Sequence, residues 1–234
     1  MDLNQLRIPT SEEWHDGRLK DYSVEGHKVS VHFKDLDLRI AEYIRRSDAV
    51  LGCVAWLTHE KIIDALATVD CSIILQKEDL WRPDMPGPIG VKSKQRIRSL
   101  YERLKCDVTR HSLPGIGADL SKETDPSIDP LRCVGTYNST RRASAPRAHH
   151  KFLVFCHKEP PREKGGHELL SPYAVWTGSF NLTQNATTSF ENAVYIRDRE
   201  IALAFAQEYA QILALSEPLE WTSHWAAPEY RIGT

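Results

Sequence analysis

The chain has 234 residues, of which 41% are hydrophobic and 26% charged, and this composition excludes a disordered chain, a coiled coil and a collagen-like repeat. Its 30 Lys and Arg against 32 Asp and Glu give a net charge of −2, which excludes a uniformly basic nucleic-acid binder but not a local basic patch. No apolar run approaches the ~18 residues that span a bilayer. The five cysteines are odd in number and contain no CxxC pair, which favours a reducing compartment. We therefore expect a cytoplasmic protein with a single domain over residues 1–234 and no stable membrane association.

The first third of the chain alternates between strand and helix patterns. Residues 29–33 alternate apolar and polar side chains like an edge strand, and residues 36–46 have apolar positions at helical spacing. Residues 49–56 and 72–76 are continuous apolar runs, which are typical of strands covered on both faces. Between these runs, Thr58 is a plausible N-cap for a short helix.

The middle of the chain is less regular. A cluster of Pro and Gly over residues 81–88 precedes a predicted helix over residues 93–105. Residues 107–131 lack a clear period and form a possible irregular insertion, which in a compact domain is usually functional or mobile.

The last third returns to the alternating pattern. Strands are predicted over residues 152–156, 173–177 and 192–196, and an apolar stripe from Ile201 to Ile212 predicts a final helix. The order of strands and helices indicates an α/β layered fold.

Two short segments carry polar side chains that suit one chemistry. On a strand, side chains at i and i+2 share a face, so His149 and Lys151 project together while His150 points away. Ser179 and Asn181 repeat this spacing. A phosphodiester needs a cation such as Lys151 and hydrogen-bond donors for its oxygens. An imidazole can attack phosphorus or protonate the leaving oxygen.

An acid on the second ring nitrogen would fix the tautomer of such an imidazole, and Glu191 is the candidate. The alternative is that Glu191 forms an ordinary surface ion pair.

These motifs resemble the HKD signature of the phospholipase D superfamily, in a single-HKD, nuclease-like form. The resemblance is specific over residues 148–197, where the run TGSFNLTQNATTSFENAVYI follows the HxK strand. It implies a mixed sheet flanked by helices on both faces, with two HKD units meeting at a two-fold axis. One histidine would be the nucleophile and the other the acid, without a metal or cofactor. By position, these roles fall to His149, Lys151, Ser179, Asn181 and Glu191.

The chain departs from the family motif at one position, because Cys156 stands where the motif has Asp. That Asp usually has a structural role, so its loss leaves the phosphate-contacting groups intact. Cys156 as a nucleophile is a rival hypothesis, although a cysteine that ends an apolar strand is more often inert core. A second HxK match, His59-Glu60-Lys61, lies in a predicted helix without a following GSxN and indicates a solvated helix face.

The best basic patch is formed by Arg141, Arg142 and Arg147, directly before His149. It either lines a phosphate approach or is a solvated loop. Trp81 and Trp176 could stack bases, but core packing is the simpler interpretation.

Together, the sequence predicts a metal-independent, homodimeric phosphodiesterase that cleaves nucleic acid, with DNA ahead of RNA. A dimer is expected because the chain has one HxK/GSxN set and the site needs two histidines. The alternatives are a phospholipase or phosphatidyl transferase acting on lipid, and a degenerate module that binds nucleic acid without cleaving it.

Overall fold

The computed structural model describes residues 2–5, 21–77, 90–113, 126–136, 147–161, 164 and 166–219. Eight strands are present in this part of the chain: β1 (Val29–His32), β2 (Ala49–Val54), β3 (Asp70–Gln76), β4 (Leu131–Val134), β5 (Lys151–Glu159), β6 (Leu169–Gly178), β7 (Ala193–Ile196) and β8 (Glu217–Pro218). The α-helices are α1 (Leu36–Arg45), α2 (Glu60–Leu66), α3 (Val91–Tyr101) and α5 (Arg199–Ala214). Three short 3₁₀ helices are η1 (Leu3–Gln5), η3 (Arg110–Ser112) and η4 (Asn185–Thr188).

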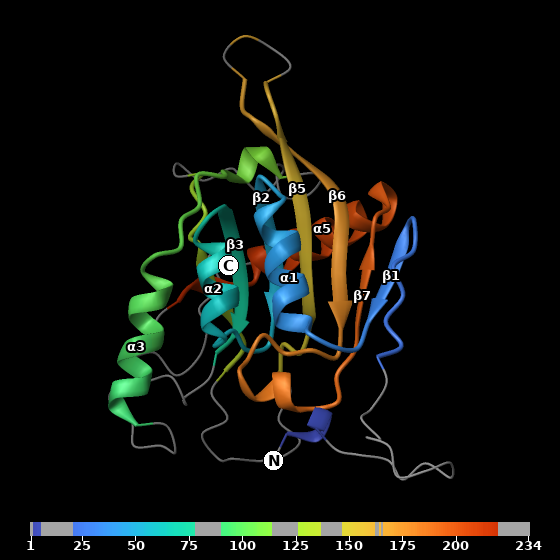
Figure 1. The fold of residues 1–234 in the computed structure, drawn as a ribbon. Coiled ribbons are helices and arrows are strands. Elements are labelled where there is room, and N and C mark those ends of the chain that lie inside the picture. The colour runs from blue at the N-terminus through green and yellow to red at the C-terminus, as the bar shows by residue number, and fades with distance from the viewer. Residues whose placement is uncertain are drawn as a thin grey trace, which may run out of the picture.

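All eight strands form one mixed sheet in the order β1-β7-β6-β5-β2-β3-β4-β8 (Figure 1). The pairs β2–β3 and β3–β4 are parallel, and the other pairs are antiparallel. Every residue of β2 and β3 is buried, as their continuous apolar runs predict for central strands.

Helices cover both faces of this sheet, and the alternation of side chains along each strand explains how. Val50 and Phe155 belong to a core cluster with α1 and α2, whereas Leu51 and Val154 belong to a second cluster with α5. In Figure 1, α1 and α2 lie in front of the sheet and α5 lies behind it. The predicted α/β fold, with a mixed sheet between helical layers, is confirmed.

Several predicted boundaries differ from the structure. The helix predicted from residue 93 begins at Val91 and ends at Tyr101, and α2 begins at Glu60, with His59 rather than Thr58 in the N-cap position. The region 107–131 contains η3 and meets β4, while residues 114–125 lie outside the described residues. The Pro/Gly cluster at 81–88 also lies outside them.

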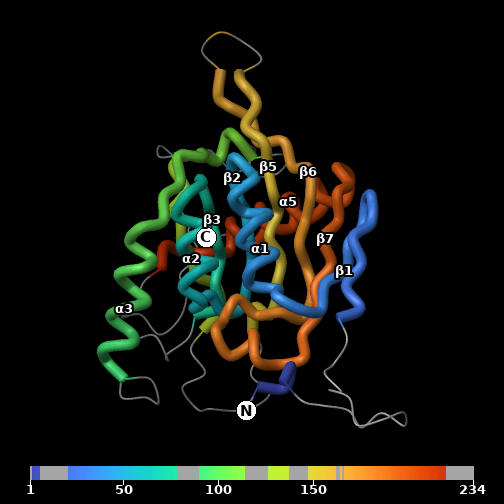
Figure 2. The backbone as a smooth tube through the Cα atoms, viewed as in Figure 1, coloured from blue at the N-terminus to red at the C-terminus, as the bar shows by residue number. Residues whose placement is uncertain are grey.

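The hairpin of β5 and β6 is longer than predicted and extends beyond one end of the sheet (Figure 2). At the other end, the segment between β6 and β7 that contains η4 passes beneath the strands and lies beside η1. Asn4 links the two segments, because its side-chain amide donates to the carbonyl oxygens of Thr187 and Ser189 at 3.1 Å each. This second end of the sheet carries the HxK and GSxN motifs described next.

Candidate active site

Four strand termini meet at this end of the sheet. Lys151, the first residue of β5, pairs with Val54, the last residue of β2. The next residue of β5, Phe152, pairs with Thr177 near the end of β6, and Gly178 pairs with Ala193 at the start of β7. The antiparallel register therefore brings the HxK segment and the GSxN segment to the same edge, at the lower end of the view in Figure 1.

His149 and Lys151 share one face, as their spacing predicts. The Lys151 Nζ atom lies 3.2 Å from His149 Nδ1 and 3.3 Å from His149 Nε2, and it donates to the His149 carbonyl oxygen at 3.0 Å. His150 turns to the opposite side, where its Nε2 atom lies 3.7 Å from Oε1 of Glu208 on α5. The structure thus separates the two adjacent histidines and places the one with the lysine on the site.

The pKa of the His149 ring is lowered from its ordinary value. Partial burial is the largest cause, followed by the positive charges of Lys151, Arg147 and His150. Burial also lowers the pKa of the Lys151 ammonium, while the negative charge of Glu191 opposes this effect. A lowered pKa keeps His149 neutral near pH 7, which is the state that a nucleophile requires.

Ser179 ties the GSxN segment to the Glu-Asn pair. Its Oγ atom donates a hydrogen bond to Glu191 Oε2 and accepts one from the Asn192 N–H at 3.1 Å. The Ser179 N–H in turn donates to the Asn192 carbonyl oxygen at 3.1 Å. Gly178 makes this approach possible, because a Cβ atom there would lie 2.3 Å from the Asn192 oxygen.

The position of Glu191 differs from the expected one. We expected this carboxylate on the second nitrogen of His149, but its hydrogen bond is with Ser179. Its charge nevertheless acts on Lys151. Glu191 therefore belongs to the same cluster, where it accepts the hydrogen bond of Ser179 and its negative charge favours the charged form of Lys151.

Asn181 lies on a loop that is anchored by buried neighbours. Phe180 and Leu182 are each 1% exposed, and Leu182 forms a parallel bridge with Leu57 just after β2. Thr58 donates its N–H to the Leu182 carbonyl oxygen at 2.8 Å. The anchored backbone fixes where the Asn181 amide stands relative to the end of β2.

Two further residues at the site were not predicted from the sequence. The Trp56 ring packs edge-on against the His149 ring, with centroids 5.8 Å apart and planes at 84°. Gln76, at the end of β3, accepts a hydrogen bond from the Ala148 N–H at 2.7 Å and so holds the approach to the histidine. The only visible signal was a glutamine at the end of the predicted buried strand 72–76; Trp56 lies two residues after β2, at the end of the apolar run 49–56, and offered none.

The predicted basic patch is described only in part. Arg141 and Arg142 lie outside the described residues. Arg147 is exposed, and its charge contributes to the lowered pKa of His149. At least this arginine therefore acts electrostatically on the site.

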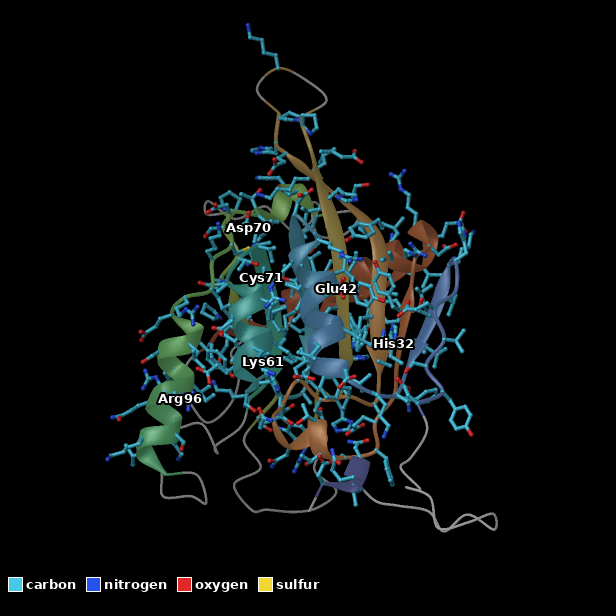
Figure 3. The ribbon with its side chains drawn as sticks, viewed as in Figure 1. His32, Glu42, Lys61, Asp70, Cys71 and Arg96 are labelled. Atoms are coloured by element: carbon cyan, nitrogen blue, oxygen red, sulfur yellow. The ribbon has the colours of Figure 1, made fainter. Side chains whose placement is uncertain are left out.

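Cys156 is remote from the site and fully buried. It pairs with Ala49 at the start of β2, and it lies five residues, or about 16 Å, along β5 from Lys151. Figure 3 shows where this far end of the sheet lies. Asp70, which also pairs with Ala49, is labelled there, at the end of the sheet away from Lys61 on α2. Burial raises the pKa of the Cys156 thiol well above its usual range, and this, together with its distance from Lys151, argues against the rival nucleophile hypothesis.

The second HxK match is only in part the solvated helix face that we expected, because Glu60 and Lys61 are exposed whereas His59 is buried. His59 is 2% exposed, and its Nε2 atom lies 3.6 Å from Asp37 Oδ2, which is also 3.7 Å from Lys61 Nζ. Burial lowers the pKa of His59, so this histidine is a neutral part of the core. Trp176 is likewise core, at 1% exposure, whereas Trp81 lies outside the described residues.

Two features of the described residues bear on cofactors and membranes. Within those residues, no group of three or more His, Cys, Asp or Glu side chains is arranged to hold a metal ion. None of the helices described is both long enough and apolar enough to cross a membrane.

Comparison with known proteins places this chain beside a viral relative. No family model matches it. It is 30% identical over 237 residues to the uncharacterized protein L381 of Acanthamoeba polyphaga mimivirus, covering 95% of this chain and 75% of L381. Among solved structures, it is similar to Nuc of Salmonella typhimurium, a phospholipase D family member (TM-score 0.46, 16% identity, 82% of this chain and 97% of Nuc). It is also similar to NucT of Helicobacter pylori (TM-score 0.49, 14% identity, 82% of this chain and 99% of NucT).

Proposed function

The chain belongs to the family of the mimivirus protein L381, and we propose that it is a phospholipase D-type phosphodiesterase that cleaves nucleic acid through His149, without a metal. The observation that carries the proposal is the contact between the Lys151 ammonium and both ring nitrogens of His149. A neutral imidazole beside a cation is the pair that attack on an anionic phosphodiester requires.

In the proposed reaction, an unprotonated ring nitrogen of His149 attacks phosphorus and forms an N–P bond. The P–O bond to the leaving nucleotide breaks, and the departing oxygen takes a proton from a second imidazole. Water then attacks the phosphohistidine and gives its proton to that second imidazole, which restores both groups. Lys151 turns from the His149 carbonyl oxygen toward the phosphate oxygens and stabilises their charge.

The amide of Asn181 is the better candidate for the phosphate donor than the hydroxyl of Ser179. A serine has only one O–H, and that of Ser179 is donated to Glu191. An asparagine has two N–H donors on its side-chain nitrogen. We therefore assign phosphate binding to Lys151 and Asn181, and the support of Glu191 to Ser179.

A homodimer supplies the second imidazole. In-line displacement needs a nucleophile on one side of phosphorus and a proton donor on the other, and one His149 cannot occupy both sides. The other HxK histidine of the chain, His59, is buried beside Asp37 and unsuitable as that donor. A two-fold axis beside the starts of β5 and β7 would bring a second His149 to the opposite face.

Nucleic acid is the proposed substrate because positive charge precedes the nucleophile. Arg147 is exposed and close enough to affect the pKa of His149, and Arg141 and Arg142 precede it in sequence. Such a run suits a polyanion with repeated phosphates. DNA is favoured over RNA as the first substrate to test.

The test is cleavage of labelled single- and double-stranded DNA and RNA in EDTA. We expect His149→Ala to lose about 10²–10⁴-fold in rate, while His150→Ala, the same residue type on the opposite face, retains most activity. Equal losses in both variants, or activity only with added Mg²⁺, would overturn the assignment. Cleavage of phosphatidylcholine vesicles with intact nucleic acid would favour the lipid alternative, and inactivity on every substrate would favour a binding module.

The shared site has its own test in a mixed dimer. A heterodimer of wild type and His149→Ala, isolated with two different affinity tags, retains only one of two required imidazoles. We expect it to be almost inactive. A mixed dimer with half of the wild-type rate, or a fully active monomer, contradicts the two-fold site.

A further inference from the structure

Two complementary polar atoms at the site are buried without partners. The Trp56 indole nitrogen, a donor, and the Asn181 side-chain oxygen, an acceptor, are both shielded from solvent, and neither finds a hydrogen-bond partner among the described residues. Buried polar atoms are nearly always paired, so each such exception calls for a physical reason. Here one unpaired atom is a donor and the other is an acceptor, so each could serve as the partner of the other.

The backbone places these two residues side by side. Leu57 and Leu182 are partners in a parallel bridge, and both are 1% exposed in the same core cluster. Trp56 and Asn181 are the residues that directly precede them, so in extended chain their side chains turn away from that core cluster. The hydrogen bond from the Thr58 N–H to the Leu182 carbonyl oxygen fixes this alignment.

Trp56 also contacts the proposed nucleophile. Its ring stands edge-on to that of His149, with centroids 5.8 Å apart. One side chain therefore touches the attacking group and neighbours the proposed phosphate donor. No other described aromatic ring packs on His149.

We propose that Trp56 is a positioning residue that acts through Asn181: when phosphate occupies the site, its indole N–H donates to the Asn181 side-chain oxygen. An asparagine amide can rotate and present either its oxygen or its NH₂ group to a ligand. If the Asn181 side-chain oxygen faces the anionic phosphate, it repels the phosphate. If that oxygen instead accepts a hydrogen bond from Trp56, both N–H donors of Asn181 point away from the indole. This inference rests on the proposed function, because it assumes that Asn181 binds phosphate.

Trp56→Phe tests the bond, since it keeps an aromatic ring beside His149 and removes the indole N–H together with part of the ring. We expect kcat for DNA cleavage to fall about tenfold, while the melting temperature falls by a few degrees because of the lost ring atoms. In an Asn181→Ala background, the same substitution should cost less than twofold, because the amide that it orients is already absent. An equal loss in both backgrounds, or no loss in the wild-type background, would overturn the proposal.

A spectroscopic measurement separates this inference from catalysis. In a ¹⁵N-labelled wild-type chain, the indole signal that Trp56→Phe removes is assigned to Trp56. Saturation with inorganic phosphate should move that proton downfield and slow its hydrogen exchange, and Asn181→Ala should abolish both effects. If the chain cleaves no nucleic acid but the indole signal responds, the proposed function fails and the positioning bond stands. If the assigned indole signal is unresponsive to phosphate in an active enzyme, the bond is refuted.

Discussion

Replacing Gly178 with alanine tests how the GSxN segment is held. An ideal Cβ atom on Gly178 would lie 2.3 Å from the Asn192 oxygen and 2.8 Å from the Ala193 Cα atom. Ordinary van der Waals contact begins near 3.4 Å. Since both obstacles are backbone atoms, the start of β7 must move by about 1 Å, with no flexible side chain to absorb the strain.

That movement has a cost that can be estimated. It would break or weaken two hydrogen bonds between Ser179 and Asn192, each now 3.1 Å long. Overpacking costs about 1–3 kcal/mol and each of the two lost bonds about 0.5–1.5 kcal/mol, so we expect Gly178→Ala to lower the free energy of unfolding by about 2–6 kcal/mol. Glu191 would move with Asn192, and the cleavage rate should fall as well.

Urea denaturation followed by tryptophan fluorescence measures the loss. With an m-value of about 2–3 kcal/mol/M, the midpoint should fall by about 1–3 M. Gly90→Ala is the matched control, because a Cβ atom on Gly90 meets nothing within 4 Å, and replacing this N-cap of α3 should cost less than about 1 kcal/mol. If Gly178→Ala has the midpoint and rate of the wild type, the close approach of β6 and β7 is not what holds the site.

The remaining predictions concern charge and burial. Arg147→Gln should raise the pKa of His149 toward its ordinary value. The midpoint of the His149 titration in NMR should then rise, and the acid limb of the kcat/KM profile should move to higher pH. An unchanged midpoint would contradict the electrostatic contact. Because burial lowers the pKa of His59 in the folded state below its unfolded value of about 6.5, the unfolded chain takes up the proton first. The free energy of unfolding should thus decline as pH falls below about 6.5, and His59→Gln should flatten that decline in urea titrations. Cys156→Asp, which introduces the Asp of the HKD motif, should destabilise the chain by at least about 3 kcal/mol, since it places a carboxyl group at a fully buried position; a wild-type urea midpoint would refute this.

The central strands could be predicted from sequence because local pattern decides them. Continuous apolar runs in β2 and β3 have one explanation, a strand covered on both faces, and the structure confirms it. β4 was missed because it contains Arg132, which is charged yet fully buried. Its guanidinium donates to Ser216 and Asp129, and only the tertiary fold brings these acceptors together.

Some contacts of the candidate site could likewise be predicted from local sequence, and others depend on the tertiary fold. The shared face of His149 and Lys151 follows from strand geometry over three residues, so the sequence was sufficient. The contacts of Trp56 and Gln76 depend on the sheet order β5-β2-β3, which joins segments more than 70 residues apart in the case of Gln76 and Ala148. Nothing in local periodicity encodes such an order.

The register of one hairpin explains why the departure at Cys156 is compatible with the site. Pairing between β5 and β6 shifts at Phe155 and Cys156, so that Phe155 faces Ala174 whereas Cys156 faces Pro172. A one-residue slip in register turns every later side chain to the other face of the sheet, and a proline without an N–H is tolerated at such an irregularity. The shift lies between the site and the hairpin tip, and regular pairing runs from Phe155 back to Phe152. Position 156 thus lies where the shifted half of the hairpin begins, whereas His149 and Lys151 lie on the other side of the regularly paired residues Phe152–Phe155, and the alternation of side chains along the strand places His149, and not His150, on the face of Lys151.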